Sequence, residues 1–162
     1  MRTIRQIVIH QSDSAFGNAT QIDAWHKERG WSGIGYHRVI LNGCVRPGIY
    51  VLRNDGLIQE GRPLEKVGAH VAGHNAHTLA ICLIGKGNGL PIALSSSAGT
   101  SGPLNGPPGY ITAGQWTSLV ALCRKWLKEF GLTPAAVLAH REFAGVHKTC
   151  PGFEVAALRA VL

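Results

Sequence analysis

The stretch HTLAICLIG, residues 77–85, is nearly all apolar and stands between a polar loop and a glycine. An apolar run of this length is typical of a strand that is buried on both faces, rather than one that alternates between core and solvent. We therefore expect residues 77–85 to form a central strand of a β-sheet, and the remaining elements are arranged around it.

Four other segments have the composition of short strands. They are rich in β-branched or other apolar residues and are bounded by polar residues or glycine: residues 3–10, 34–41, 48–62 and 135–140. The first is predicted to end at His10, and the last is predicted to end at His140. Residues 48–62 are predicted to form a hairpin that turns at Asn54-Asp55-Gly56.

Capping signals predict where the helices begin and end. Thr20-Gln-Ile-Asp23 resembles a capping box that opens a helix ending at Gly30, and Thr112-Ala-Gly-Gln115 opens a longer helix ending at Gly131. A final helix is predicted over residues 153–162. The long helix carries one apolar face, formed by Trp116, Leu119, Val120, Cys123, Trp126, Leu127 and Phe130. Strands mixed with helices predict one α/β or α+β sheet covered by helices.

Size and composition indicate a single compact domain spanning residues 1–162. The chain is 45% hydrophobic and 15% charged, which excludes a disordered protein. No apolar run reaches the roughly 20 residues needed to cross a bilayer, and the N-terminal apolar stretch is too short for a secretory signal. Residues 85–111 are rich in Gly, Ser and Pro, and we expect a surface loop there; a linker between two half-domains is the alternative.

The chain is basic, with 16 Lys and Arg against 9 Asp and Glu and a net charge of +7. Such a charge attracts polyanions, including nucleic acid, anionic lipid and the acidic polymers of bacterial envelopes. No long Lys/Arg run or nucleic-acid-binding motif occurs, so nucleic acid is not the expected partner.

One thiol and two histidines could form a metal site. His10 and His140 each close an apolar strand, where functional sites gather, and Cys150 has polar neighbours in EFAGVHKTCPGF, residues 142–153. Two histidines and a thiolate suit Zn²⁺ and leave the fourth position free for water, as in a catalytic site. The alternative is that each imidazole only bonds to backbone at the end of its strand.

Two further residues could assist catalysis. Lys148 stands two residues before Cys150, so both side chains share a face if this segment is extended. Its ammonium could stabilise negative charge on a substrate oxygen, or it could be a solvated surface lysine. Tyr36 could donate its hydroxyl to the same oxygen, or it could pack within its strand.

Cys82 and Cys123 have apolar neighbours and are predicted to be buried thiols. A secreted disulfide scaffold is a further alternative for the four cysteines.

Four segments together resemble the amidase-2 family of zinc N-acetylmuramoyl-L-alanine amidases: IVIHQS (7–12), WHKERGWSGIGYHRVI (25–40), VGAHVAGHNAHTLAICLIG (67–85) and AHREFAGVHKTCPGF (139–153). The likeness is closest to the amidase-type lysozymes of tailed phages, which are related in fold to the peptidoglycan recognition proteins. The resemblance implies a single mixed central β-sheet flanked by helices. It also implies an enzyme that cuts the amide between N-acetylmuramic acid and L-alanine of the peptidoglycan stem peptide.

The resemblance assigns roles to seven residues. His10, His140 and Cys150 match the zinc ligands, and Tyr36 and Lys148 match the catalytic tyrosine and lysine. His70 and Asn75 are implied to lie near the substrate cleft, with stabilisation of their loop as the alternative. Some branches of the family carry a glutamate where this chain has Cys82, so that carboxylate base is not available here.

The resemblance also leads to an expected biological role. We expect a monomeric phage or prophage endolysin whose partner is bacterial peptidoglycan, with no separate wall-binding domain and with anionic envelope polymers attracting its basic surface. It would be made in the host cytoplasm without a signal peptide and act on the wall after release. A non-catalytic peptidoglycan recognition protein and a cytoplasmic amidase that recycles soluble muropeptides remain as alternatives.

Overall fold

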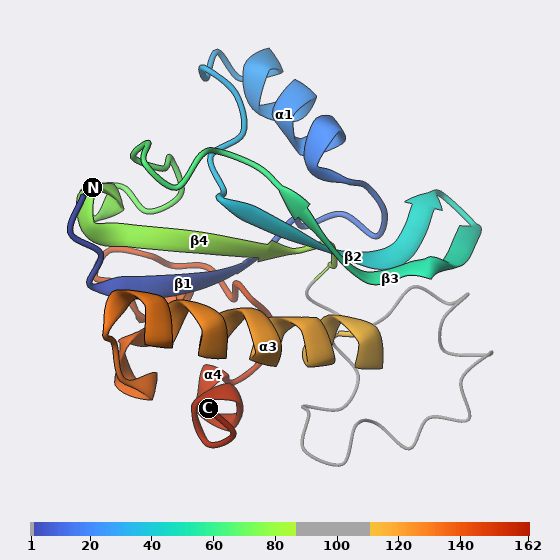
Figure 1. Cartoon of the computed structure of the whole chain (residues 1–162). Helices are drawn as coiled ribbons and strands as arrows, with labels where there is room; N and C mark the ends of the chain where they lie inside the picture. The colour runs from blue at the N-terminus through green and yellow to red at the C-terminus, as the bar shows by residue number, and fades with distance from the viewer. Residues whose placement is uncertain (1, 87–110) are drawn as a thin grey trace.

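The computed structural model describes residues 2–86 and 111–162, and it contains a five-stranded sheet with the strand order β3-β2-β4-β1-β5 (Figure 1). The strands are β1 (Gln6–Gln11), β2 (Arg38–Arg46), β3 (Ile49–Glu60), β4 (Thr78–Leu83) and β5 (Val137–Ala139). All neighbouring strands are parallel except β2 and β3, which are antiparallel. The sheet is therefore mixed, as the resemblance implied.

Strand β4 is the middle strand of the sheet, and all six of its residues are buried. It pairs with β1 on one side and with β2 on the other. The prediction of a central buried strand within residues 77–85 is confirmed. A strand with neighbours and covering layers on every side has no solvent-facing positions, which explains why its sequence is continuously apolar.

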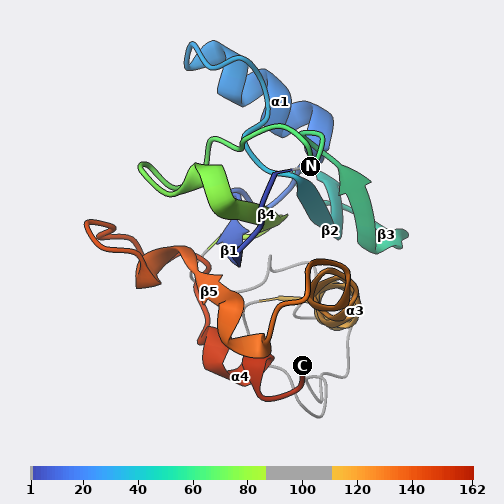
Figure 2. The ribbon, with the colours of Figure 1, turned by 60° about the vertical axis from the view of Figure 1, so that its left-hand side comes forward.

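Helices cover both faces of this sheet. Figures 1 and 2 show α1 (Ala19–Glu28) on one face and α3 (Ala113–Phe130) with α4 (Val155–Arg159) on the other. Ile7 and Ile9 of β1 belong to the core cluster that includes α3, whereas Val8 belongs to a cluster on the opposite face. Because side chains alternate along a strand, His10 is directed away from α3.

The long helix begins and ends where its capping signals predict. The Thr112 side chain accepts a hydrogen bond from the Gln115 backbone N–H, the Gln115 side chain accepts one from the Thr112 backbone N–H, and Gly131 ends α3 with a φ of 64°. This reciprocal arrangement satisfies two of the backbone donors that the first turn of a helix leaves unpaired.

The first helix begins two residues earlier than predicted. Its N-cap is Asn18, whose side chain accepts a hydrogen bond from the backbone of Gln21, and Thr20 lies inside the helix. The capping box predicted at Thr20–Asp23 is therefore wrong. The Asp23 carboxylate instead accepts a hydrogen bond from the backbone N–H of Ile34, tying the helix to the segment that leads into β2.

The predicted hairpin turn at Asn54–Gly56 is also wrong. Strand β3 continues through these residues, and its turn connects it to β2 at residues 47–48. Gly56 has a φ of 77°, and a Cβ at this position would lie 2.6 Å from the Gly114 carbonyl oxygen at the start of α3. The glycine thus permits an irregularity in the strand and a close approach of the helix, which local sequence alone cannot distinguish from a turn.

The C-terminal elements follow the predicted order. Strand β5 leads into a short 3-10 helix, His140–Glu142, and α4 is shorter than the helix predicted over residues 153–162. The loop predicted at residues 85–111 lies almost wholly outside the described residues. Within residues 2–86 and 111–162, no helix combines the length and the apolar character that crossing a bilayer requires.

Candidate metal centre and cleft

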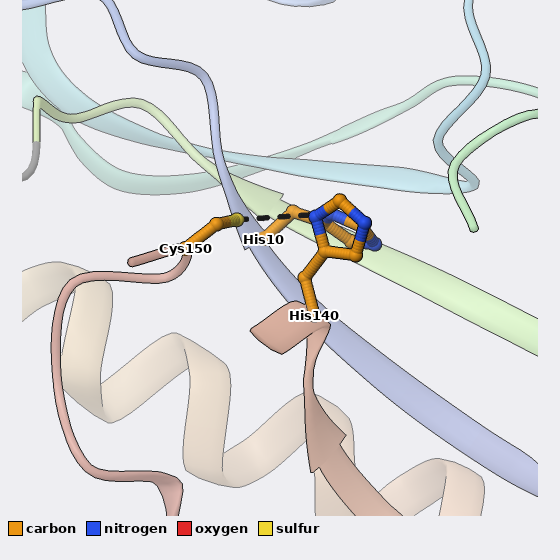
Figure 3. Close-up of side chains that lie close together, drawn as sticks. All are labelled: His10, His140 and Cys150. Atoms are coloured by element: carbon orange, nitrogen blue, oxygen red, sulfur yellow. Dashed lines mark hydrogen bonds between the residues drawn. The ribbon is translucent and has the colours of Figure 1, made fainter. Parts of the chain in front are cut away.

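Two adjacent parallel strands bring His10 and His140 together. Ile9 of β1 pairs with Ala139 of β5, so the histidines that follow them lie side by side at the carboxyl-terminal ends of the two strands. Their ring centroids are 4.5 Å apart. One ligand atom from each of His10, His140 and Cys150 lies within 4.8 Å of the others, and the three side chains point toward one another (Figure 3). The structure thus brings together the three predicted metal ligands.

Hydrogen bonds hold the thiol against the end of β1. The backbone N–H of Gln11 donates to Cys150 Sγ at 3.3 Å, and the backbone N–H of Arg141 donates to the Cys150 carbonyl at 3.1 Å. The Arg141 guanidinium also donates to the Thr149 carbonyl at 3.0 Å. These contacts fold residues 141–150 back toward His140. They place Cys150 at the carboxyl-terminal end of β1, from which it is distant in sequence.

Burial sets the protonation of His10 and Cys150 in the absence of a cation. Burial lowers the pKa of His10 well below 6.5, with further lowering from His70, His140 and Lys148, and burial raises the pKa of the Cys150 thiol to about 11. The imidazole is therefore neutral and able to coordinate at pH 7, whereas the thiol keeps its proton unless a cation favours the thiolate. Two imidazoles and one thiol are a donor set that fits Zn²⁺ with one position left open.

Tyr36 approaches this group from the segment that enters β2. Its ring centroid is 5.1 Å from that of His10. Burial raises the pKa of the Tyr36 hydroxyl well above 10, so it remains a hydrogen-bond donor at neutral pH. Gly35 permits this placement, because a Cβ there would lie 2.1 Å from the Ala69 carbonyl oxygen.

Lys148 is exposed, and its positive charge acts on the candidate ligands. Burial lowers the pKa of both His10 and His140, and the positive charge of Lys148 lowers both further. Lys148 lines a cleft of about 410 Å³ together with His140, His70, Asn75 and Trp31. A cationic side chain at the border between the donor group and an open cleft can contact a substrate that enters the cleft.

His70 and Asn75 both line the cleft, and both also make internal contacts. His70 Nδ1 lies 3.1 Å from His10 Nε2, and His70 Nε2 lies 3.2 Å from Thr78 Oγ1. The Asn75 side-chain oxygen accepts hydrogen bonds from the backbone N–H groups of His70 and Val71, both at 2.9 Å. Asn75 therefore stabilises the loop in addition to facing the cleft.

Sequence reasoning missed two residues of this region. Trp31 borders the cleft with 42% of its surface exposed, and its ring lies 4.5 Å from that of His26. His26 is buried, and its Nδ1 accepts a hydrogen bond from the Gly35 backbone N–H. The signal for Trp31 was an aromatic residue in a glycine-rich loop, whereas His26 carried no sequence signal.

All four cysteines are free, so a disulfide scaffold is not formed. Cys82 and Cys123 are fully buried, as predicted. Burial raises the pKa of the Cys123 thiol to about 12 and that of Cys82 well above 9. Burial also raises the pKa of Cys150, but there the Gln11 backbone N–H, Lys148 and Arg141 act in the opposite direction, and no basic side chain does so for Cys82 or Cys123.

Solved structures share this fold. The N-acetylmuramoyl-L-alanine amidase LysC from Clostridium intestinale superposes with a TM-score of 0.70 and 29% identity, over 98% of this chain and 85% of that one. Drosophila peptidoglycan recognition protein SA superposes with a TM-score of 0.63 at 19% identity, over 94% and 75% of the two chains, which is a likeness of fold. An endolysin of Klebsiella phage KP32 is 30% identical over 139 residues, covering 83% of this chain and 70% of the phage protein.

The family model and these relatives place the chain among the hydrolases of the peptidoglycan amidase class. The chain belongs to the N-acetylmuramoyl-L-alanine amidase family Amidase_2, whose model matches residues 1–153. Its activity is that of the family, hydrolysis of the amide between N-acetylmuramic acid and L-alanine.

Proposed function

We propose that this amidase is a zinc enzyme of the endolysin type, with His10, His140 and Cys150 as the ligands and Tyr36 and Lys148 as the catalytic residues. The observation that carries the proposal is the convergence of three good zinc donors within 4.8 Å of one another, one of which, His140, lines the cleft. A bound zinc ion supplies Lewis acidity, lowering the pKa of a water molecule toward ~7 and polarising the scissile carbonyl.

The chain's own residues orient and stabilise the substrate. Tyr36 keeps its proton and donates its hydroxyl, and Lys148 supplies a positive charge at the cleft, so both stabilise negative charge that develops on the carbonyl oxygen. The two side chains come from different elements, the approach to β2 and the loop before Cys150. His70 and Asn75 lie on the cleft wall, where the stem peptide would pass.

The phage relatives, which are endolysins, support a biological role in cell-wall lysis. We propose that the protein acts on intact cell wall after release from the cell that makes it. Its net charge of +7 attracts it to anionic envelope polymers. Lysis is then expected to weaken as ionic strength rises, because salt screens this attraction.

The test is turbidity loss of bacteria with permeabilised outer membranes. Native protein, chelator-treated protein and Cys150→Ala are compared, with analysis of the products for new L-alanine amino termini. We expect lysis by the native protein alone and recovery of the chelated sample when zinc is added. Folded, zinc-loaded protein that releases no L-alanine amino termini would support the recognition-protein alternative, and cleavage of soluble muropeptides but not of sacculi would support the recycling alternative.

A further inference from the structure

The two nitrogens of the His10 ring have different neighbours. Nδ1 lies 3.8 Å from Cys150 Sγ, on the side of the candidate ligands. Nε2 lies 3.1 Å from Nδ1 of His70, with the two rings nearly perpendicular at 87°. His10 can therefore offer Nδ1 to a metal only if its ring proton is on Nε2.

The hydrogen bonds beyond His10 are compatible with that protonation at every step. Nε2–H of His10 donates to Nδ1 of His70, so His70 carries its own proton on Nε2 and can donate to Thr78 Oγ1 at 3.2 Å. The Thr78 hydroxyl in turn donates to the His74 carbonyl at 3.1 Å, the shorter of its two contacts with backbone carbonyls. Each proton has one donor and one acceptor, and the series ends on a backbone oxygen that can only accept.

We propose that His70 and Thr78 are positioning residues that hold His10 in the tautomer and orientation needed to bind metal through Nδ1. This inference rests on the proposed metal centre and adds to it a role for His70 other than contact with substrate. Hydrogen bonds from a metal-binding histidine to such partners typically change metal affinity about 10- to 100-fold.

The surroundings restrict where the His70 ring can lie. The backbone of His70 is tied to the Asn75 side chain, and Thr78 is the first residue of the central strand and only 1% exposed. A Cβ on Gly68 would lie 2.5 Å from Cδ2 of His70 and 2.9 Å from its Nε2. The ring therefore fits between Gly68 and His10 because residue 68 has no side chain.

The experiment measures zinc affinity of the whole chain by competition with a chromogenic chelator. The variants are His70→Ala, Thr78→Val and Thr78→Ser, with His77→Ala and Thr117→Val as controls that remove an exposed histidine and an exposed helix hydroxyl. Thermal unfolding of each metal-free variant shows whether an effect is only one of stability. The absorption spectrum of the Co²⁺ form reports the ligand geometry.

We expect His70→Ala to bind zinc about 10- to 100-fold more weakly than native protein. Thr78→Val should move affinity in the same direction and alter the Co²⁺ spectrum, and Thr78→Ser should restore both. Affinities of His70→Ala and Thr78→Val within about twofold of their controls would overturn the inference. Contact with the substrate would then remain as the role of His70. If His70→Ala does not fold, Thr78→Val against Thr78→Ser decides the same question. Failure of the native protein to bind zinc, or retention of tight binding by Cys150→Ala, would instead overturn the proposed metal centre.

Discussion

The sulfur of Cys150 lies 3.8 Å from Nδ1 of His10, although 140 positions separate the two residues in the chain. The contact joins the first strand to the loop after the last strand. A metal ion held between them would therefore link the two ends of the fold, and its removal should affect stability as well as activity.

Removal of the metal is expected to lower the unfolding temperature and abolish hydrolysis together. A ligand that binds only the folded state stabilises it by about 2.7 kcal/mol at a free concentration 100 times its dissociation constant. Calorimetry with and without chelator measures this difference. Cys150→Ser should show little further change on chelation, whereas Cys123→Ala, which removes a buried thiol elsewhere, should respond like the native protein. Equal responses of the two variants would argue against Cys150 as a ligand.

Zinc affinity is expected to rise with pH. The Cys150 thiol has a pKa of about 11 without metal, so between pH 7 and 9 it is protonated and must release its proton when zinc binds. His10 and His140 have lowered pKa values and are already neutral in this range. One released proton predicts an increase of about tenfold in affinity for each pH unit. Competition titrations at pH 7, 8 and 9 measure the slope, and a flat profile would mean that no thiol proton is released.

Replacing Lys148 should slow hydrolysis without loss of metal. Loss of one group that stabilises a developing oxyanion typically reduces the rate about 10²- to 10³-fold. Lys148→Met should show this decrease, while Lys125→Met, an exposed lysine of α3, should not. Steady-state hydrolysis of a soluble muropeptide gives the rate, and zinc content is measured on the same samples. A fall in lysis of whole cells with unchanged muropeptide hydrolysis would place Lys148 in wall attraction instead of catalysis.

Tyr36→Phe removes only a hydroxyl that burial keeps protonated. We expect a decrease in turnover of about 10²-fold with unchanged zinc affinity, because the ring that packs 5.1 Å from His10 is retained. Tyr50→Phe is the matched control, since the hydroxyl of Tyr50 donates to Asp55 at 3.3 Å in the β2–β3 hairpin. Native activity in Tyr36→Phe would show that the tyrosine only packs.

Acid should destabilise the metal-free protein through His37. Burial lowers its pKa from 6.5 to about 4, so the unfolded chain binds a proton that the folded chain does not, and stability falls as pH decreases from 6.5 toward 4. His37 alone should account for about 2 kcal/mol of the loss between pH 7 and pH 5. Urea unfolding at both pH values checks this. His37→Gln keeps an acceptor for the Ala80 N–H and a donor for the Lys66 carbonyl, and it should show a smaller fall than native protein. An equal fall in His37→Gln would assign the effect to other buried histidines.

Several elements of the fold could be predicted because their signals are local. The capping box of Thr112 and Gln115, the αL glycine at Gly131 and the apolar run of β4 each depend on neighbouring residues and on burial. The start of α1 was misplaced because Asn18 and Thr20 are both good N-cap residues two positions apart. The turn at Asn54–Gly56 was wrong because the reason for Gly56 is the approach of Gly114, which is distant in sequence.

The sequence by itself determined the strand ends that carry His10 and His140, the polar surroundings of Cys150 and the donor types that favour zinc, since these depend on residue identity and periodicity. Only the tertiary structure decided which nitrogen of His10 faces the thiol and that His70 and Thr78 lie behind the other one. The physical reason is that these hydrogen-bond partners meet only when β1 pairs with β4 and the loop before β4 folds over the end of β1. Residues 10, 70 and 78 have no periodic relation along the chain that would reveal it.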